Sequence, residues 1–233
     1  MNKMKNLKIN NFVYLIVAFS AIAWFSLSMA TGQDLANAKS FFKLIPNVVT
    51  IDIFIILIFT KWFWRLRIFR GWLVPFPNLN GTWLGHINSD WINPSTGQST
   101  SPIPVMLTIN QSLLHISCVM HTGEMKSYSF SEGLHIDSER QIKQIAYIYT
   151  SKPRITVNQR SLPHDGAIVF DIIEVPIKKL SGRYWTERKT TGEIVLTFNN
   201  NKILEELPAE LGTHPVTNVN KSKVITKKEN GIS

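Results

Sequence analysis

A stretch without any charged residue, Phe12 to Met29, limits most strongly what this chain can fold into. A helix of about eighteen residues is roughly 27 Å long, close to the bilayer hydrocarbon thickness of about 30 Å. A cleaved signal peptide is the alternative, but its apolar core is usually shorter, and here a second apolar segment follows closely. The sequence therefore predicts a transmembrane helix over residues 12–30.

The second apolar segment, predicted as a transmembrane helix over residues 47–64, carries one acidic residue, Asp52. If this helix enters the membrane just after Pro46, Asp52 lies near the outer interface, where a carboxylate costs little. Alternatively, Asp52 makes a polar contact between helices of neighbouring subunits, which makes it a candidate oligomer contact. The sequence leaves both interpretations open.

The positive charges indicate how the two segments are oriented. Residues 1–11 and the juxtamembrane linker, residues 65–78, are strongly basic, whereas the connecting loop, residues 31–46, is only weakly so. Because lysine and arginine favour the cytoplasmic side, we expect both termini in the cytoplasm and the loop outside. The net charge of +9 is concentrated beside apolar segments and in the C-terminal tail, which favours anionic lipid and predicts no DNA or RNA partner.

Beyond the linker, residues 79–200 show short runs with strand-like alternation, separated by turn residues and without helical periodicity. This pattern predicts an all-β antiparallel domain, a small eight-stranded β-barrel whose interior fits side chains or one small ligand. The strands are expected near Gly81–Ser89, Val105–Gln111, Leu113–His121, Lys126–Phe130, Gln144–Thr150, Ala167–Val175, Gly182–Arg188 and Glu193–Phe198. Residues 201–233 are expected to form a polar, disordered tail.

One five-residue pattern occurs twice, as Leu79-Asn80-Gly81-Thr82-Trp83 and as Leu180-Ser181-Gly182-Arg183-Tyr184. The structural interpretation is that glycine allows a close backbone approach where a strand enters the barrel, and that the aromatic ring plugs the barrel end. The functional interpretation is that both rings take part in ligand binding.

The sequence contains no recognisable catalytic motif. P-loop, dinucleotide-binding, His-Glu-x-x-His and Gly-x-Ser-x-Gly patterns are all missing from it. The six histidines are scattered without metal-ligand spacing, and the single cysteine, Cys118, fits a small core residue. We therefore expect a protein that is not an enzyme and has no metal site and no cofactor.

Basic and aromatic residues are mixed near the end of the β-rich domain. On a strand, Tyr184 and Arg188 face the same way, with Thr186 between them, which places a ring, a hydroxyl and a guanidinium in one row. A nucleotide suits this row, because its base stacks on the ring and its phosphate binds the guanidinium. Tyr147, Tyr149 and Arg154 would supply an opposite wall, and Trp83 is a further candidate; a solvated basic face with packing aromatics is the alternative.

The layout from Phe12 to Phe198 resembles a known family. Two N-terminal helices precede a β-rich domain that opens with Leu-Asn-Gly-Thr-Trp and ends in Gly-Arg-Tyr-Trp-Thr-Glu-Arg-Lys-Thr-Thr-Gly-Glu-Ile. This is similar to the SMODS-associating two-TM β-strand-rich effectors of bacterial CBASS anti-phage systems. The Tyr-x-x-x-Arg-x-x-x-Gly run at Tyr184, Arg188 and Gly192 carries most of the resemblance within the domain.

The resemblance implies a function that the residues alone do not give. In that family the cytoplasmic barrel binds a cyclic oligonucleotide, here expected to be a cyclic dinucleotide. Binding drives oligomerisation in the inner membrane and disrupts it, which causes abortive infection. The family's binding role carries over to Tyr184, Arg188 and Thr191, which lie in the matching run, whereas Tyr147, Arg154 and Trp83 rest on their chemistry alone.

Two other functions compete with this expectation. Gly81-Thr82-Trp83 is similar to the opening Gly-x-Trp of lipocalins, so a membrane-anchored barrel that binds an apolar small molecule or lipid is the main alternative. A membrane-bound hydrolase is the least favoured, because the sequence offers no evident pair of nucleophile and base.

Overall fold

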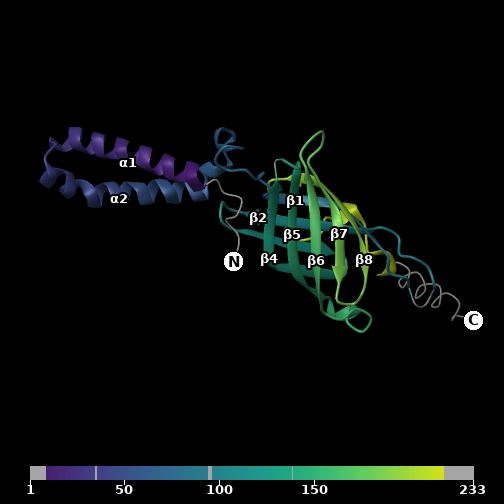
Figure 1. Ribbon diagram of the computed structural model, residues 1–233. Coiled ribbons are helices and arrows are strands. Elements are labelled where there is room, and N and C mark those ends of the chain that lie inside the picture. The colour runs from purple at the N-terminus through teal and green to yellow at the C-terminus, as the bar shows by residue number, and fades with distance from the viewer. Residues whose placement is uncertain (1–8, 35, 94–95, 138, 218–233) are drawn as a thin grey trace, which may run out of the picture. The chain divides into compact units, whose positions relative to one another are not determined.

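A computed structural model describes residues 9–34, 36–93, 96–137 and 139–217 (Figure 1). The chain divides into two compact units, one of residues 1–78 with Ser112–Leu114 and one of Leu79–Gln111 with His115–Ser233. The two units are described separately below. The extreme N-terminus and the end of the predicted tail, residues 218–233, lie outside the described residues.

The first unit contains a helical hairpin of α1 (Ile9–Thr31) and α2 (Ala38–Lys61). Both helices are long and apolar enough to cross a membrane by length and composition. Ring contacts join them near both ends: Phe12 meets Phe59 with centroids 5.3 Å apart, and Trp24 stacks on Phe41 at 4.4 Å. Large apolar side chains on the outer faces are exposed, which is the pattern of helices that face lipid.

Helix α2 begins earlier than the sequence predicts. It starts at Ala38, where the Asn37 side chain accepts the Lys39 N–H at 3.0 Å, and it continues through Pro46. Pro46 therefore does not mark where the helix begins, and Asp52 lies near the middle of the 24-residue helix.

Asp52 makes its contact within the hairpin. The Ser20 hydroxyl of α1 donates to its Oδ2 at 2.6 Å, while its other oxygen, Oδ1, is buried without a hydrogen-bond partner among the described residues.

After α2, two single-turn 3-10 helices, η1 (Phe63–Arg65) and η2 (Arg67–Phe69), lead out of the hairpin. Lys61 lies over the exposed Trp62 ring at 4.8 Å, as expected for a basic and aromatic belt. Trp64 is instead buried and lies against Phe76, so it belongs to the packing of this unit.

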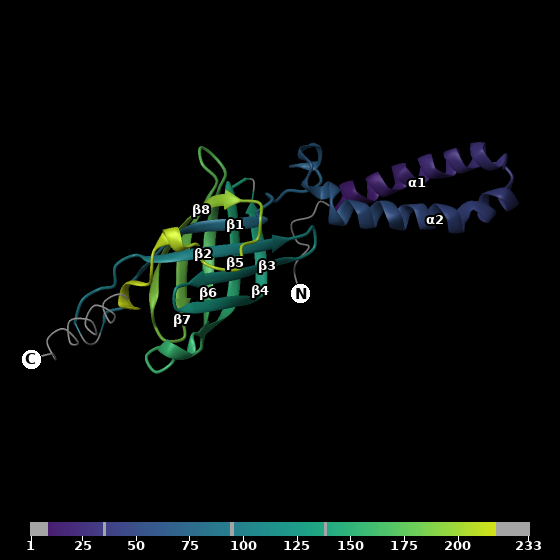
Figure 2. The same cartoon turned by 180° about the vertical axis from the view of Figure 1, so that it is seen from behind.

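The second unit is a closed barrel of eight antiparallel strands in sequence order, which confirms the predicted fold class (Figures 1 and 2). Hydrogen bonds between the first and last strands complete the closure. The strands are β1 (Gly81–Ser89), β2 (Ile103–Gln111), β3 (Ile116–Thr122), β4 (Met125–Asp137), β5 (Ile142–Pro153), β6 (His164–Ile173), β7 (Lys179–Thr186) and β8 (Thr191–Asn200).

Apolar side chains fill one half of the barrel interior. Trp83, Phe170 and Leu180 are completely buried there. The Trp83 indole N–H donates to the Leu79 carbonyl oxygen at 2.9 Å, and its ring meets the edge of Phe198 at 5.1 Å. This packing closes one end of the barrel, and Cys118, also buried, is part of the same core.

The repeated Leu-x-Gly-x-aromatic pattern fits its structural interpretation at the two glycines. Gly81 has a φ of +128°, which side chains rarely adopt. A Cβ atom at Gly182 would lie 1.9 Å from the Val169 carbonyl oxygen of the neighbouring strand. Both positions therefore require glycine for close backbone approach, independently of any ligand.

Three features of this unit differ from the sequence-based expectation. Strand β6 begins at His164, three residues before the predicted start at Ala167, and Arg188 lies beyond the end of β7. Residues 201–217 are not a disordered tail, because they fold back on the barrel: the Thr82 hydroxyl donates to the Lys202 carbonyl oxygen and accepts the Leu204 N–H.

The packing of Trp83 predicts a large effect on stability. Trp83→Ala should lower the free energy of unfolding by about 3–5 kcal/mol, because it removes a fully buried ring and leaves a cavity. Trp185→Ala is the matched control, since this ring is 49% exposed on the outer wall. Urea unfolding followed by the β-sheet circular dichroism signal measures both, and equal effects would contradict the assigned packing of Trp83.

Candidate functional site

The second unit has a partly open cavity of about 170 Å³, here called the mouth cavity, at the end where β1, β3, β5 and β7 finish. Apolar side chains form its floor, and polar and charged side chains form its rim. The floor includes Ile87, Met120, Ile168 and Ile194, and the rim includes Ser89, Glu124, Tyr149, Ser151, Arg160, Ser161, His164, Tyr184, Thr186, Arg188 and His214.

Two tyrosines from different strands line this cavity. Tyr184 of β7 is half-buried, and its hydroxyl donates to Ser89 Oγ at 2.8 Å. Tyr149 of β5 is buried, with 6% of its surface exposed, and lies two residues along the strand from Tyr147. Burial raises the pKa of both Tyr184 and Tyr149, so both phenols are neutral at physiological pH. The cavity therefore offers aromatic surface without negative charge from these groups.

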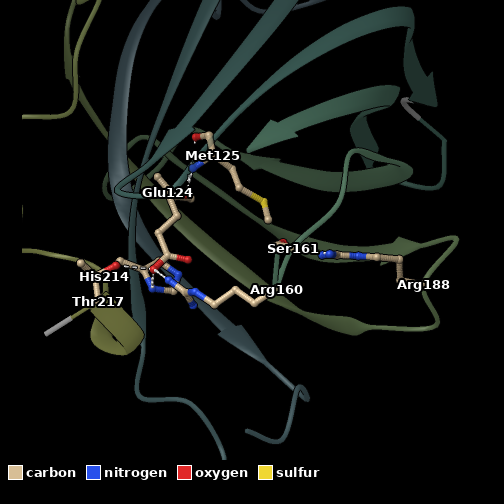
Figure 3. Close-up of polar contacts among 8 residues, drawn as sticks. Glu124, Met125, Arg160, Ser161, Arg188, His214 and Thr217 are labelled. Atoms are coloured by element: carbon tan, nitrogen blue, oxygen red, sulfur yellow. Dashed lines mark hydrogen bonds and ion pairs between the residues drawn. The ribbon is translucent and has the colours of Figure 1, made fainter. Parts of the chain in front are cut away.

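Arg188 reaches the cavity from the tight turn between β7 and β8. Its Nη1 donates to Ser161 Oγ at 2.9 Å (Figure 3). Its Nη2 lies 3.4 Å from His164 Nε2. Thr186 and Thr190 hold the turn through their hydroxyls, whose oxygens are 2.7 Å apart. Burial lowers the pKa of Arg188, but an arginine remains charged at neutral pH.

His164 acts as a neutral partner for that guanidinium. Its Nδ1 lies 3.1 Å from the Leu162 carbonyl oxygen, which assigns the ring proton to Nδ1 and leaves Nε2 to accept from Arg188. Burial, together with the positive charge of Arg188, lowers the pKa of His164. The imidazole is therefore uncharged near pH 7 and does not compete with an anion.

A second charged cluster is centred on Glu124 in the turn between β3 and β4. Its Oε1 accepts from Arg160 and from the Thr217 hydroxyl, and His214 Nδ1 lies 3.1 Å from the same oxygen (Figure 3). Burial raises the pKa of Glu124, but the contacts with His214, Thr217 and Arg160 outweigh burial and lower it to about 2. The carboxylate is therefore ionised across the physiological range.

The structure places the predicted binding residues in different surroundings. Tyr184 and Arg188 line the mouth cavity together. Thr191 points its hydroxyl and its N–H at the Asp90 carboxylate, at 2.7 and 2.8 Å. Arg154 is exposed and donates its N–H to the Glu124 carbonyl oxygen.

The remaining two predicted residues, Trp83 and Tyr147, are buried in the barrel interior. Neither is among the residues that line the mouth cavity.

The sequence did not indicate Glu124, Arg160, Ser161 or His164 as site residues. Glu124 lies between β3 and β4 and Arg160 between β5 and β6, so strand alternation gave no signal for them. His164 precedes the predicted strand Ala167–Val175. Tyr149 was found because it lies two residues from Tyr147 on one strand face. Among the described residues, no three His, Cys, Asp or Glu side chains gather as a metal site.

The Glu124 cluster predicts a specific pH dependence. Because its pKa falls from 4.5 in the unfolded chain to about 2 in the fold, its stabilising effect is complete above pH 4.5 and is lost as the pH falls through about 2. The melting temperature of the wild type should exceed that of Glu124→Gln above pH 4.5. This difference should shrink towards pH 2 in thermal melts, and a constant difference would contradict the assigned ionisation.

Comparison with known proteins shows which family the barrel resembles. A family model described as Cap15, cyclic dinucleotide receptor domain, matches residues 74–197, more than half of the chain. The curated proteins yielded no match. The matched region includes β1 to β7 and most of β8, and therefore both Tyr184 and Arg188. The match confirms the resemblance found in the sequence: the chain belongs to the Cap15 cyclic dinucleotide receptor family, a family of CBASS membrane effectors.

Proposed function

We propose that the mouth cavity binds a cyclic dinucleotide, with a base stacked on Tyr184 and a phosphate bound by Arg188. The observation that carries this proposal is that an aromatic ring and a partly exposed guanidinium line one cavity within the matched receptor region. Base stacking on an aromatic side chain contributes about 1–3 kcal/mol, and arginine binds phosphate through two parallel hydrogen bonds.

The contacts of Arg188 leave room for a phosphate. Its partners, Ser161 and His164, are both neutral, so the positive charge is positioned but not neutralised by them. The apolar floor beneath would exclude water from the ligand and strengthen this electrostatic interaction. We propose that Thr191 acts indirectly: its bonds to Asp90 fix the start of β8 next to the Arg188 turn.

The other predicted binding residues have weaker support. Tyr147 and Trp83 are buried core residues, and Arg154 is exposed outside the cavity lining. A direct ligand contact by Tyr147 or Trp83 would require movement of the barrel, and Arg154 would have to turn towards the cavity, so the proposed site rests on Tyr184 and Arg188.

We further propose that ligand binding drives oligomerisation of this chain in the bacterial inner membrane and disrupts that membrane, as a CBASS effector in abortive infection. The basic flanks of the two apolar helices support an orientation with both termini, and hence the barrel, in the cytoplasm. There the barrel would meet an intracellular nucleotide. The ligand switches assembly only if it binds the assembled state more tightly than the monomer.

Asp52 is the proposed contact between neighbouring copies. Its buried Oδ1 has no donor among the described residues, and it borders a cavity of about 230 Å³ between the two helices. An unsatisfied carboxylate oxygen in apolar surroundings is costly, so a donor from a second hairpin would stabilise the assembly.

The apolar floor of the mouth cavity favours one alternative, a lipocalin-like barrel for an apolar ligand. A titration of the purified chain with cyclic dinucleotides and with fatty acids separates the two functions. Heat released by a cyclic dinucleotide supports the receptor. A rise in melting temperature with fatty acids only would favour the apolar ligand and contradict the proposal.

For the binding site, Arg188→Ala should weaken cyclic dinucleotide binding about 10–100-fold, because one charge-assisted phosphate contact is lost. Arg183→Ala is the matched control: Arg183 lies on β7, just before the turn that carries Arg188, is exposed and does not line the cavity. Isothermal titration calorimetry measures both affinities. Wild-type affinity in Arg188→Ala would remove this residue from the site.

For the membrane step, Asp52→Leu should retain ligand binding but reduce ligand-dependent dye release from liposomes at least about 5-fold, since polar contacts between helices contribute roughly 1 kcal/mol each. Asp52→Asn is the control, because its amide oxygen still accepts from Ser20 and its NH2 group still offers a polar contact to a neighbour. Full leakage with Asp52→Leu would show that this side chain is not an assembly contact.

A further inference from the structure

Arg160 lies on the rim of the same mouth cavity as Arg188 but has a different partner. The Arg188 guanidinium contacts neutral groups, whereas Arg160 is paired with the Glu124 carboxylate. The Glu124 side chain is 5% exposed and the Arg160 side chain is 34% exposed. The carboxylate is therefore buried, whereas the guanidinium that pairs with it is partly exposed.

The C-terminal segment holds this carboxylate from the other side. His214 and Thr217 both contact Glu124 Oε1, and His214 and Val216 line the cavity. The segment follows Gly212, whose φ of +86° ends the short 3-10 helix η4 (Ala209–Leu211). Residues 213–217, here called the C-terminal strap, thus form part of the cavity wall without belonging to the sheet.

The charges on the rim are mismatched to a cyclic dinucleotide. Such a ligand carries two phosphates, each with one negative charge. Among the arginine and carboxylate side chains that line the cavity, Arg160 and Glu124 neutralise each other, which leaves Arg188 as the arginine without a carboxylate partner there. The second phosphate would meet a buried carboxylate, and like charges in a partly desolvated site repel strongly.

We propose that Arg160 is the second phosphate-binding residue, that Glu124 occupies it in the unliganded state, and that the C-terminal strap holds Glu124 in place until a ligand phosphate displaces it. This inference rests on the proposed function of the same site. The phosphate takes over the Arg160 guanidinium, Glu124 turns away, and the strap loses the oxygen that both His214 and Thr217 contact. Ligand occupancy is thereby converted into release of residues 213–217 from the barrel mouth.

The arrangement lowers the apparent affinity for the ligand in a calculable way. The measured dissociation constant equals the intrinsic value divided by the fraction of molecules in which Glu124 has left Arg160. Variants that weaken the closed state therefore bind more tightly, although they remove contacts seen in the structure. A merely structural Glu124 would give the opposite result, because losing its contacts would loosen the cavity wall.

The test compares the full-length wild type with Glu124→Gln and Thr217→Val by calorimetry, using cyclic dinucleotides and inorganic pyrophosphate as probes. Glu124→Gln should bind both probes at least about 10-fold more tightly, and Thr217→Val about 3-fold, because it removes one strap contact and keeps the carboxylate. The gain should disappear in the double variant Glu124→Gln/Arg160→Gln. Thermal melts check that each variant is folded. If Glu124→Gln does not fold, Thr217→Val still tests the inference.

Hydrogen exchange of the strap amides adds an independent readout. Exchange at residues 213–217 should increase when a cyclic dinucleotide is added to the wild type. If the wild type binds cyclic dinucleotides but neither variant binds more tightly, or strap exchange is unchanged, the inference is wrong and the proposed function stands. If no cyclic dinucleotide binds while pyrophosphate still prefers Glu124→Gln, the proposed function fails and the displaceable carboxylate stands.

Discussion

Closure of the sheet through the pairing of β1 with β8 is the constraint on which the rest of the second unit depends. An eight-stranded barrel has an interior only wide enough for side chains or one small ligand. Trp83, Phe170 and Leu180 are completely buried in its core. Space for a ligand therefore remains at the opposite end, where the inward side chains become smaller or polar and the cavity opens.

The same closure brings together residues that are far apart in the sequence. Arg188 donates to Ser161, which is 27 residues away in the sequence, and Arg160 pairs with Glu124, which is 36 residues away. Each arginine lies in a connection between strands, where the backbone is less restrained than in the ladder. A rigid wall that carries charged groups on adaptable turns suits a receptor that must respond to its ligand.

Sequence reasoning predicted the fold well because both signals it used are local. Alternating apolar residues and turn residues identified all eight strands, and β1 was predicted from Gly81 to Ser89, as observed. The start of α2 was missed because Pro46 was taken as a helix boundary, whereas the helix continues through this proline, as helices in membranes often do.

The candidate site was less accessible to the sequence. Strand alternation predicted Tyr184 and Arg188 on one face; both line the cavity, but Arg188 does so from the turn beyond β7, where alternation does not apply. The same reasoning could not separate Tyr149, which lines the cavity, from Tyr147, which lies on the same face but outside the lining. Depth in a barrel depends on strand stagger and closure, and the pairing of Arg160 with Glu124 depends on loop positions that no local pattern encodes.

The most direct test of the account is a crystal structure of the chain with a bound cyclic dinucleotide. The account predicts a base against the Tyr184 ring and a phosphate within hydrogen-bonding distance of the Arg188 guanidinium, both at the open end of the barrel. A ligand on the outer wall, or at the closed end beside Trp83, would contradict it.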